Sequence, residues 1–430
     1  MYRITRRQFV TTLGTLAATS ITSAALPRYG HSALKGTRLH LLRNSSYSPA
    51  ENDWFKETIK KQWAEPNGVD LVVELVSEND LQAKVSVAIE SGSGPDILGL
   101  IHNLAHLYSP KLRDVSAIAE KQEVDGEGHW EICKANCKVG GVWKAIPMNI
   151  GANAIHYRTD LLKEVGERKF PNNLDDYNRV GKLLKQKGTP TGQAVGHTIG
   201  DPPSWFYSLL WMFGGAEVDE TGKKVAINTK ETLAAVEFAA QWYRDSLTPD
   251  MLGWDDASNN KAYLAGLIWA TSNSPSILLT AKKDFPDIDA NKDLTNYPKG
   301  PKGLFQYGTV YSHAIPTYVK DPKPAEELLR WIADPKNYNA WLDIGSSAFA
   351  APVRAYSRHP IWTKDPRMAV FKDLSMYRWP GAPGPASPAA SEVLSKFIII
   401  DMFAKAMQGT KPQEAVIWAE RQLKGIYDKA

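Results

Sequence analysis

The fold is decided by an apolar stretch near the N-terminus, Val69-Asp70-Leu71-Val72-Val73-Glu74-Leu75-Val76. Such nearly continuous apolar character is typical of a parallel strand that is covered on both faces. A helix is expected to open at Asn79, because apolar residues follow there at four-residue spacing. It is broken by Ser91-Gly92-Ser93-Gly94-Pro95, and Asp96–Ile101 is then predicted to be the next strand.

The residues before this stretch supply one more strand and one more helix. In Thr37–Arg43, Leu39 and Leu41 alternate with polar residues, which predicts a strand. Ser48-Pro49-Ala50-Glu51 then has the pattern of a capping box with proline at the first helical position. The order is therefore β-α-β-α-β, which predicts the start of a doubly wound α/β domain with right-handed crossovers.

Strands and helices continue to alternate along the rest of the chain. Strands are predicted at Val142–Met148 and Ala154–Tyr157, on either side of Asn149-Ile150-Gly151. Pro380–Pro388 holds four prolines and two glycines, a composition that favours a crossover loop. Helices are predicted over Leu174–Gln186, Trp205–Phe213, Lys323–Ala333, Lys336–Ile344, Ser391–Gln408 and Gln413–Tyr427.

Length and composition bound the class of protein. A chain of 430 residues predicts two or three domains, and its near-average composition excludes a disordered, collagen-like or disulfide-dense chain. Two cysteines cannot ligate an iron–sulfur cluster or a Cys₄ zinc site unaided. The net charge of +4 falls to +1 if cleavage after Ala25 removes Arg3, Arg6 and Arg7. A near-neutral mature chain gives no electrostatic reason to expect nucleic acid or an anionic membrane as partner.

Residues 1–30 are predicted to be a cleaved twin-arginine signal peptide. Thr5-Arg6-Arg7-Gln8-Phe9-Val10 carries the paired arginines, and Val10–Leu26 is uncharged. That stretch is too short and too polar to span about 30 Å of hydrocarbon. Ser23, Ala24 and Ala25 are small enough for a cleavage site. The alternative is a frayed helix that happens to carry Arg-Arg. Twin-arginine export predicts a mature protein in a bacterial periplasm.

The two cysteines leave two interpretations open. Cys133 and Cys137 are four residues apart, unlike a redox Cys-x₂-Cys pair or a zinc knuckle. In an oxidising periplasm they can form a local disulfide, or they can remain two free, partly buried thiols. Neither interpretation indicates catalysis.

Motifs for metal, nucleotide or esterase chemistry are weak. His102 and His106 have the spacing of a helical zinc pair, but the glutamate after the first histidine is absent and no third ligand is evident. The chain contains no phosphate loop, no dinucleotide fingerprint and no Gly-x-Ser-x-Gly elbow. The acid pairs Asp175-Asp176 and Asp255-Asp256 are interpreted as helix N-termini or solvated turns.

Tryptophan is the most informative residue type, with 14 in the chain. Six lie within helical periodicities and are expected to be packing residues: Trp54, Trp63, Trp242, Trp331, Trp341 and Trp418. Trp205, Trp254, Trp269 and Trp379 instead lie near predicted turns or element ends, beside polar residues. An aromatic face packs against the C–H face of a sugar, while amides and hydroxyls bond its hydroxyl groups. For each of these four, core packing is an equally good interpretation.

Several segments, in order, resemble extracellular solute-binding proteins of family 1, the sugar-binding subunits of ABC importers. They include Gly94-Pro95-Asp96-Ile97, Trp143-Lys144-Ala145-Ile146-Pro147, Phe170–Gly188, Pro324–Trp331 and the tail Met402–Trp418. Each segment alone is weak, but their order and spacing extend over nearly the whole mature chain. The chain departs from the family at Asn173-Leu174-Asp175, where a Thr-Trp pair commonly precedes the acid.

The resemblance implies a two-lobed, type II-like periplasmic-binding-protein fold, with each lobe a mixed or parallel sheet flanked by helices and the ligand cleft between the lobes. The N-lobe is expected at 37–149 plus 314–375, and the C-lobe at 150–313 plus 376–430. Crossings between them are expected near Asn149–Gly151, Thr309–His313 and Trp379–Gly384. The resemblance also implies a carbohydrate ligand, a membrane permease as partner, a monomer, and neither cofactor nor metal.

Ligand-binding residues are expected beyond the carboxyl ends of strands, as in other open α/β sheets. The candidates for hydrogen bonding are amides, hydroxyls and histidines, and two tryptophans are candidate stacking platforms. They are Asn44, Ser46, Asn103, Asn149, His197, Asn273, Tyr311 and His313, with Trp205 and Trp379 for stacking. For His197 and His313 a structural role is the slightly favoured alternative.

Two alternatives to a neutral, unaltered ligand remain. Arg354 and Arg378 lie near the expected hinge and could pair with an anionic group on a sugar, although a solvated surface role is the favoured interpretation. The competing class is a secreted periplasmic carbohydrate hydrolase. It would need two cleft carboxylates roughly 5–10 Å apart.

Overall fold

The fold begins with the parallel β-α-β unit that the sequence predicts. The structure is a computed structural model and describes residues 34–46, 48–344 and 349–429, so the predicted signal peptide lies outside the described residues. Strand β1 (Arg38–Asn44) pairs in parallel with both β2 (Asp70–Val76) and β3 (Ile97–Ile101). Helix α3 (Glu78–Ser91) connects β2 to β3, which confirms the predicted doubly wound start.

The first sheet is completed by two strands from later in the chain. Its order is β2-β1-β3-β11-β6, with β6 at Ile146–Gly151 and β11 at Thr309–Ala314. Strand β11 runs antiparallel to both of its neighbours, and Tyr311 lies opposite Ile101 on one side and Asn149 on the other. The sheet is therefore mixed. Residues of β11 and the last residue of β6 border the cleft described below.

The second sheet is small and antiparallel, with the order β8-β7-β9. Its strands are β7 (Ala154–Arg158), β8 (Ala270–Asn273) and β9 (Lys292–Thr295). The long helices of this half are α8 (Leu174–Gln186), α9 (Asp201–Phe213), α10 (Lys230–Ser246), α17 (Pro388–Ser395), α18 (Ile398–Met407) and α19 (Pro412–Tyr427).

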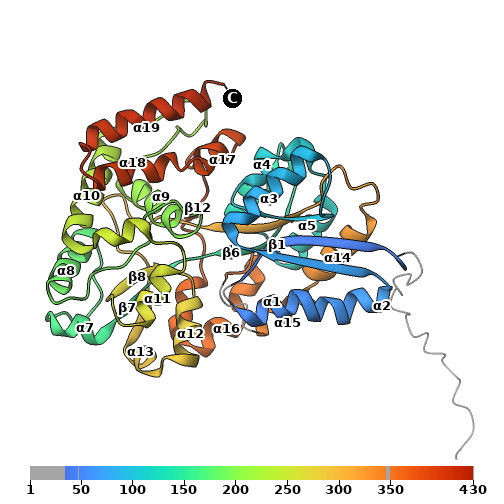
Figure 1. Ribbon diagram of the computed structural model, residues 1–430, viewed down its shortest axis with the longest axis horizontal. Coiled ribbons are helices and arrows are strands. Elements are labelled where there is room, and N and C mark those ends of the chain that lie inside the picture. The colour runs from blue at the N-terminus through green and yellow to red at the C-terminus, as the bar shows by residue number, and fades with distance from the viewer. Residues whose placement is uncertain (1–33, 47, 345–348, 430) are drawn as a thin grey trace, which may run out of the picture.

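The buried apolar residues form two separate cores, which we use to define the N-lobe and the C-lobe. Figure 1 shows the ribbon divided into two halves that correspond to these lobes. Apart from a few side chains, the N-lobe core consists of residues 34–154 and 310–377, and the C-lobe core of residues 155–307 and 382–427. The chain thus passes three times between the cores. Trp379 packs against both cores at one of these passages.

The remaining elements are short. The other helices are α1 (Pro49–Asp53), α2 (Glu65–Asn67), α4 (Leu104–Leu107), α5 (Ser116–Asp125), α6 (Glu131–Cys137), α7 (Thr159–Glu164), α11 (Ser258–Leu264), α12 (Ser276–Asp284), α13 (Pro286–Ala290), α14 (Lys323–Ala333), α15 (Pro335–Asp343) and α16 (Ile361–Lys364). The other strands are β4 (Lys138–Val139), β5 (Val142–Trp143), β10 (Gln306–Tyr307) and β12 (Tyr377–Arg378). Within the described ranges, no helix combines the length and the apolarity needed to cross a membrane.

Several local predictions differ from the structure, for example Val142–Met148, which is divided between β5 and β6. The predicted helix Ser391–Gln408 is broken into α17 and α18, because Phe397 has a φ of 55° and its ring stacks on that of His197. Ser48 does precede α1, but its side chain makes no capping bond. Glu51 does not complete a capping box, because its carboxylate accepts a hydrogen bond from buried Arg43 at 3.1 Å.

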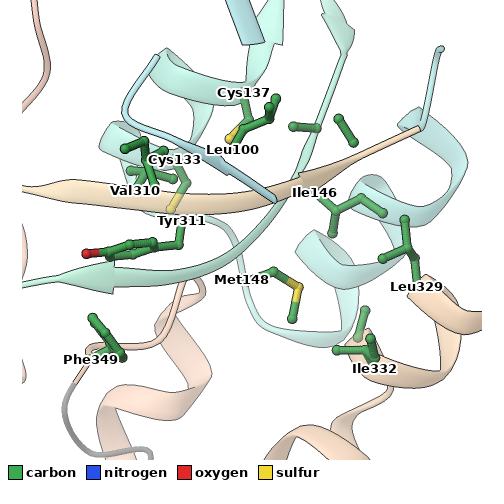
Figure 2. Packing of buried hydrophobic residues seen from close by; sticks show 14 of the residues in the cluster. Leu100, Cys133, Cys137, Ile146, Met148, Val310, Tyr311, Leu329, Ile332 and Phe349 are labelled. Atoms are coloured by element: carbon green, nitrogen blue, oxygen red, sulfur yellow. The ribbon is translucent and has the colours of Figure 1, made fainter. Parts of the chain in front are cut away.

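The structure decides between the two interpretations of the cysteines. Cys133 and Cys137 are both buried and both free thiols, so the disulfide interpretation is wrong. They pack among the apolar residues of the N-lobe core, together with Leu100 and Val310 (Figure 2). Burial raises the pKa of the Cys137 thiol to about 12, which keeps it neutral and unreactive.

Candidate functional site

A cleft lined mostly by polar residues lies between the two lobes. It contains about 440 Å³ of empty space, open space at its mouth included. The N-lobe contributes Glu78, Gly151, Thr309, Tyr311 and Phe349, and Asn153 lies where the chain crosses. The C-lobe contributes Gly200, Asp201, Ser204, Asp256, Asn273 and Ser274.

The N-terminus of α9 forms one wall of the cleft. Asp256 caps this helix from a distance in the sequence, because its carboxylate accepts hydrogen bonds from the Asp201 amide at 2.8 Å and the Gly200 amide at 3.3 Å. The Thr198 hydroxyl donates to the same carboxylate at 2.8 Å. A Cβ at Gly200 would lie only 3.0 Å from Cγ of Asp256, so glycine permits this close approach. The helix start therefore holds Asp256 firmly at the cleft.

Asp201 is the most deeply buried acid of the cleft. Its side chain is 7% exposed, and Oδ2 accepts hydrogen bonds from Asn259 at 2.7 Å and from Asn273 at 3.4 Å. Burial raises the pKa of Asp201 well above its ordinary value, and repulsion from Asp256 adds to this effect. Burial likewise raises the pKa of Asp256. The two carboxylates thus share a poorly solvated space.

Glu78 faces them from the N-lobe. It is the first residue of α3, directly after the carboxyl end of β2, and the Tyr311 hydroxyl donates to its Oε1 at 2.6 Å. Burial raises the pKa of Glu78 to about 7, and the charge of Asp256 contributes to the increase. Carboxylates from both lobes therefore interact across the cleft.

The charge of the cleft is not balanced by basic groups. Among the described residues that line it, none is Lys, Arg or His. The groups that contact the three carboxylates are amides, hydroxyls and backbone N–H groups, which are neutral donors. Neutral donors solvate a carboxylate but leave its charge in place.

An aromatic pair forms the apolar part of the lining. The rings of Tyr311 and Phe349 meet edge to face, with centroids 5.0 Å apart (Figure 2). Both residues line the cleft. A flat apolar surface beside polar groups suits a ligand with both C–H and hydroxyl faces.

Two of the candidate residues predicted from the sequence lie in this cleft. Asn273, at the end of β8, and Tyr311, on β11, come from different lobes and line the same space. Both were selected as strand-end residues: Asn273 is the last residue of β8, whereas Tyr311 lies within β11. The other candidates lie elsewhere in the described structure.

The predicted tryptophans do not line the cleft. Trp205 is fully buried in the C-lobe core, where its ring lies 4.9 Å from that of Trp242 and 5.3 Å from that of Tyr297. It leaves no accessible ring face for a ligand, and Ser204 of the same helix lines the cleft instead. The indole N–H of Trp379 donates to the carbonyl of Gly384 at 3.0 Å, within the passage between the lobes.

The predicted histidines have structural contacts. His197 is exposed, pairs with Asp401 and stacks on Phe397. His313 is buried edge to face with the ring of Phe55, and burial with the nearby charge of Arg43 lowers its pKa to about 3. Neither histidine lines the cleft.

The remaining predicted polar residues are tied to backbone or buried. The amide of Asn44 donates to the Ser45 carbonyl, and the hydroxyl of Ser46 accepts from the Ser48 N–H. The amide of Asn103 donates across the lobes to the Ser387 carbonyl at 3.3 Å. Asn149 is buried in β6, where its Oδ1 has no hydrogen-bond partner among the described residues.

Neither candidate arginine reaches the cleft. The guanidinium of Arg354 lies over the ring of Trp130 at 4.6 Å, and that of Arg378 over the ring of Phe305 at 4.2 Å. Both are held by cation–π contacts. They offer no binding site for an anionic ligand group in the cleft.

The acids of the cleft are the residues that the sequence analysis missed. Asp256 was interpreted as part of a solvated turn, and this holds only for its neighbour Asp255, whose carboxylate accepts a hydrogen bond from the Ser258 hydroxyl. Asp176 does lie at a helix N-terminus, as predicted, where its N–H donates to Asn173. The position of Glu78 next to a strand end was the available signal, whereas nothing local distinguishes Asp256 from Asp255.

The two histidines of the weak metal motif are used within the fold. His102 joins the lobes, since its ring nitrogens contact the Tyr307 hydroxyl at 2.6 Å and the Ile199 carbonyl at 3.0 Å. His106 contacts the Ala135 carbonyl. Across the described ranges, no group of three or more His, Cys, Asp or Glu side chains is placed to hold a metal ion.

Two α/β lobes around a polar cleft define the class of ligand-binding proteins that close on a small molecule. The bacterial extracellular solute-binding protein family matches residues 58–370, and the chain belongs to this family. A protein of Deinococcus radiodurans named "Probable ABC transporter-binding protein" is 25% identical over 243 residues, which is 53% of this chain and 55% of that protein. The chain spans 55% to 64% of the length of the curated relatives that it matches.

Solved structures share the fold over nearly the whole chain. The maltose-bound MalE3 of T. maritima has a TM-score of 0.77 at 19% identity and covers 90% of this chain and 99% of its own. A solute-binding protein of Agrobacterium radiobacter K84 in complex with ribitol has a TM-score of 0.75 at 17% identity and covers 91% and 99%. At such identities the likeness establishes the two-lobed fold.

Proposed function

We propose that this chain is the periplasmic substrate-binding subunit of an ABC importer. It captures a small carbohydrate, that is a sugar, a sugar alcohol or a glycoside, and presents it to a membrane permease. The observation that carries the proposal is a cleft whose hydrogen-bonding groups come from both lobes of a solute-binding fold. A polyhydroxylated ligand matches such a set of acceptors and donors.

The mechanism follows from contacts on both sides of the ligand. Glu78 and Tyr311 lie on the N-lobe side, and Asp201 and Asn273 on the C-lobe side. A ligand that bridges them binds the closed state more tightly than the open one, and this difference in affinity shifts the population towards closure. The three chain passages between the cores are the places where a hinge can bend. The permease then recognises the closed shape.

Solved structures with the same fold support a carbohydrate ligand. The similar structures include proteins solved with maltose and with ribitol, a disaccharide and a sugar alcohol. Export by the twin-arginine segment at 1–30 places the mature chain in the periplasm, where it acts as a monomer. The ligand leaves the cleft chemically unchanged.

Isothermal titration calorimetry with a panel of sugars, sugar alcohols and glycosides tests this function. We expect saturable binding with a dissociation constant in the micromolar range or below, and a smaller radius of gyration in solution scattering when the ligand is bound. The absence of saturable heat across the panel would contradict the proposal. A radius of gyration that does not change on binding would contradict the closure mechanism.

A carbohydrate hydrolase remains the second candidate, because the cleft does contain carboxylates on both sides. Glu78 faces Asp201 and Asp256 across the cleft, and a glycosidase requires such a pair of carboxyl groups. Incubation with aryl glycosides separates the two functions. We expect no release of the aryl group and full recovery of any bound sugar, whereas turnover that is lost in Glu78→Gln would establish the hydrolase.

A further inference from the structure

The acidic side chains of the cleft indicate which kind of chemical group the ligand carries, whereas the fold of the protein does not. Glu78 comes from the N-lobe, whereas Asp201 and Asp256 come from the C-lobe. The three interact through space, since the charge of Asp256 raises the pKa of both of the other acids. Like charges on opposite walls oppose closure of the empty protein.

The protein itself does not neutralise this charge. Asp256 accepts hydrogen bonds from the Thr198 hydroxyl and from two backbone amides, and Asp201 accepts from the amides of Asn259 and Asn273. These donors are all neutral. The described lining residues include no basic side chain. The missing positive charge must therefore come from whatever occupies the cleft, or the acids must protonate.

A separate observation shows that a polar ligand group is expected there. Thr309 is 4% exposed and lines the cleft. Among the described residues its hydroxyl has no hydrogen-bond partner. It lies two positions before Tyr311 on β11, so the two side chains point to the same face of the strand. The hydroxyl is not one of the fully buried atoms that lack a partner, so it is open to the cleft and can bond to a hydroxyl group of the ligand.

We infer that the ligand is a polyhydroxylated molecule that carries a protonated amine, such as an amino sugar or an amino sugar alcohol, with the amine between Glu78 and the Asp201–Asp256 pair. This inference rests on the proposed function and names its substrate class. The hydroxyl groups of the ligand engage Thr309 and the amides. The amine replaces repulsion between the lobes by attraction to both, so it adds to the ligand's preference for the closed state.

An organic cation fits better than a bare metal ion. No group of three or more potential metal-ligand side chains in the described ranges is placed to hold an ion, even though the acids share the cleft. The cleft also offers the Tyr311–Phe349 ring pair, which suits a carbon skeleton rather than an ion.

Matched ligand pairs test the inference by calorimetry at pH 7.5 and low salt. The probes are glucitol with 1-amino-1-deoxyglucitol, and glucose, galactose and mannose with their 2-amino-2-deoxy forms and N-acetylated derivatives. In each pair that binds, we expect the amine to bind at least tenfold more tightly than the neutral partner. N-acetylation, which removes the charge, should abolish this advantage. Magnesium chloride and putrescine are titrated as cations without hydroxyl groups.

Charge variants locate the amine. Glu78→Gln keeps an oxygen that accepts the Tyr311 hydrogen bond, and Asp256→Asn keeps an acceptor for the α9 N-terminus. Each is expected to reduce the advantage of the amine over its neutral partner at least fivefold. Glu90→Gln, on the exposed far end of α3, is the matched control and should alter neither affinity. Circular dichroism and melting temperature verify folding.

The pH dependence gives an independent measure. The amine of 1-amino-1-deoxyglucitol stays protonated from pH 8 to pH 5, because aliphatic amines have a pKa of roughly 10. The groups that face Glu78 are Tyr311 on β11 and the acids Asp201 and Asp256 of the C-lobe. All three acids lose charge as the pH falls, so affinity for the amine should fall at least tenfold. Affinity for glucitol should not fall.

The outcomes distinguish failure of the amine inference from failure of the proposed function. Neutral members that bind as tightly as their amines overturn the inference and leave the proposed function standing. Saturable binding of magnesium, or binding of putrescine more tightly than every amino polyol, also overturns the inference. No saturable heat from any neutral or amino member overturns the proposed function together with it.

Discussion

Helix α9 borders two groups of buried carboxylates that behave differently. At its N-terminus, Asp201 shares the cleft with Asp256 and Glu78. Further along the helix, the Tyr207 hydroxyl donates to Glu217, whose side chain is 1% exposed in the C-lobe core. Burial raises the pKa of both Glu78 and Glu217 to about 7. A raised pKa therefore does not by itself identify the functional carboxylate.

The partners of the two glutamates make the difference. Both oxygens of Glu217 accept hydrogen bonds, from Tyr207 at 3.1 Å and from Tyr427 at 2.7 Å, and these bonds join α9 to α19. Glu78 accepts one hydrogen bond in the structure, from Tyr311, and faces other acids across open space. We conclude that Glu217 is a structural link and that Glu78 belongs to the binding cleft. Four experiments test this contrast.

The largest expected effect is on stability, from Glu217→Ala. The substitution leaves two buried tyrosine hydroxyls without their acceptor and creates a cavity, so the free energy of unfolding should fall by about 4 kcal/mol. Urea unfolding at pH 5 measures this change. Ligand affinity should remain the same, because Glu217 does not line the cleft. A loss of affinity without a loss of stability would reverse the assignment of the two glutamates.

The second effect is a pH dependence of stability. The pKa of Glu217 is raised from 4.5 to about 7, so the folded state binds its proton more tightly than the unfolded state does. This contribution to stability is complete below pH 4.5 and is lost as the pH rises through 7, by about 3 kcal/mol in total. Glu217→Gln cannot titrate there. Its unfolding free energy relative to the parent should therefore rise by this amount between pH 4 and pH 8, and a constant difference would contradict the shift.

The third effect concerns the empty protein. Glu78→Gln removes one of the charges that oppose closure, while the amide oxygen still accepts the Tyr311 hydrogen bond. At pH 8 we expect the ligand-free variant to populate the closed state more than the parent does. The free energy of closure should become more favourable by about 1 kcal/mol or more, the size of an interaction between charges near a protein surface. Small-angle scattering should show a smaller radius of gyration. The Glu90→Gln control should match the parent, and an identical effect there would point to net charge alone.

The smallest effect is expected from Tyr311→Phe. The variant loses the hydroxyl that donates to Glu78 but keeps the ring contact with Phe349. Loss of this hydrogen bond to Glu78 should weaken ligand binding by about 0.5 to 1 kcal/mol. Calorimetry with the best ligand of the panel measures it. Unfolding should be little affected, so a large drop in melting temperature would show that Tyr311 is structural.

Local pattern was sufficient for the parallel start of the fold and for single helix ends. The apolar run at Asp70–Val76 forms a strand of the N-lobe sheet, and α8 has the predicted bounds Leu174–Gln186. Asn273 and Tyr311 were selected as residues at strand ends, and both lie in the cleft, although Tyr311 lies within β11. Such features depend on residues a few positions apart, so the sequence carries them directly.

Only the three-dimensional structure shows which acids meet. Tyr311 donates to Glu78 across 233 positions, and Asp256 caps a helix that begins 55 positions earlier. Asp255 and Asp256 are neighbours of the same type, yet Asp255 is exposed and Asp256 lines the cleft. Trp205 and Tyr311 are both aromatic, yet Trp205 is buried in a core and Tyr311 lines the cleft. The amino-acid order thus sets each strand, cap and turn. The contents of the cleft depend on how the two lobes, each with its own core, approach each other, since burial and charge arise from contacts between distant segments.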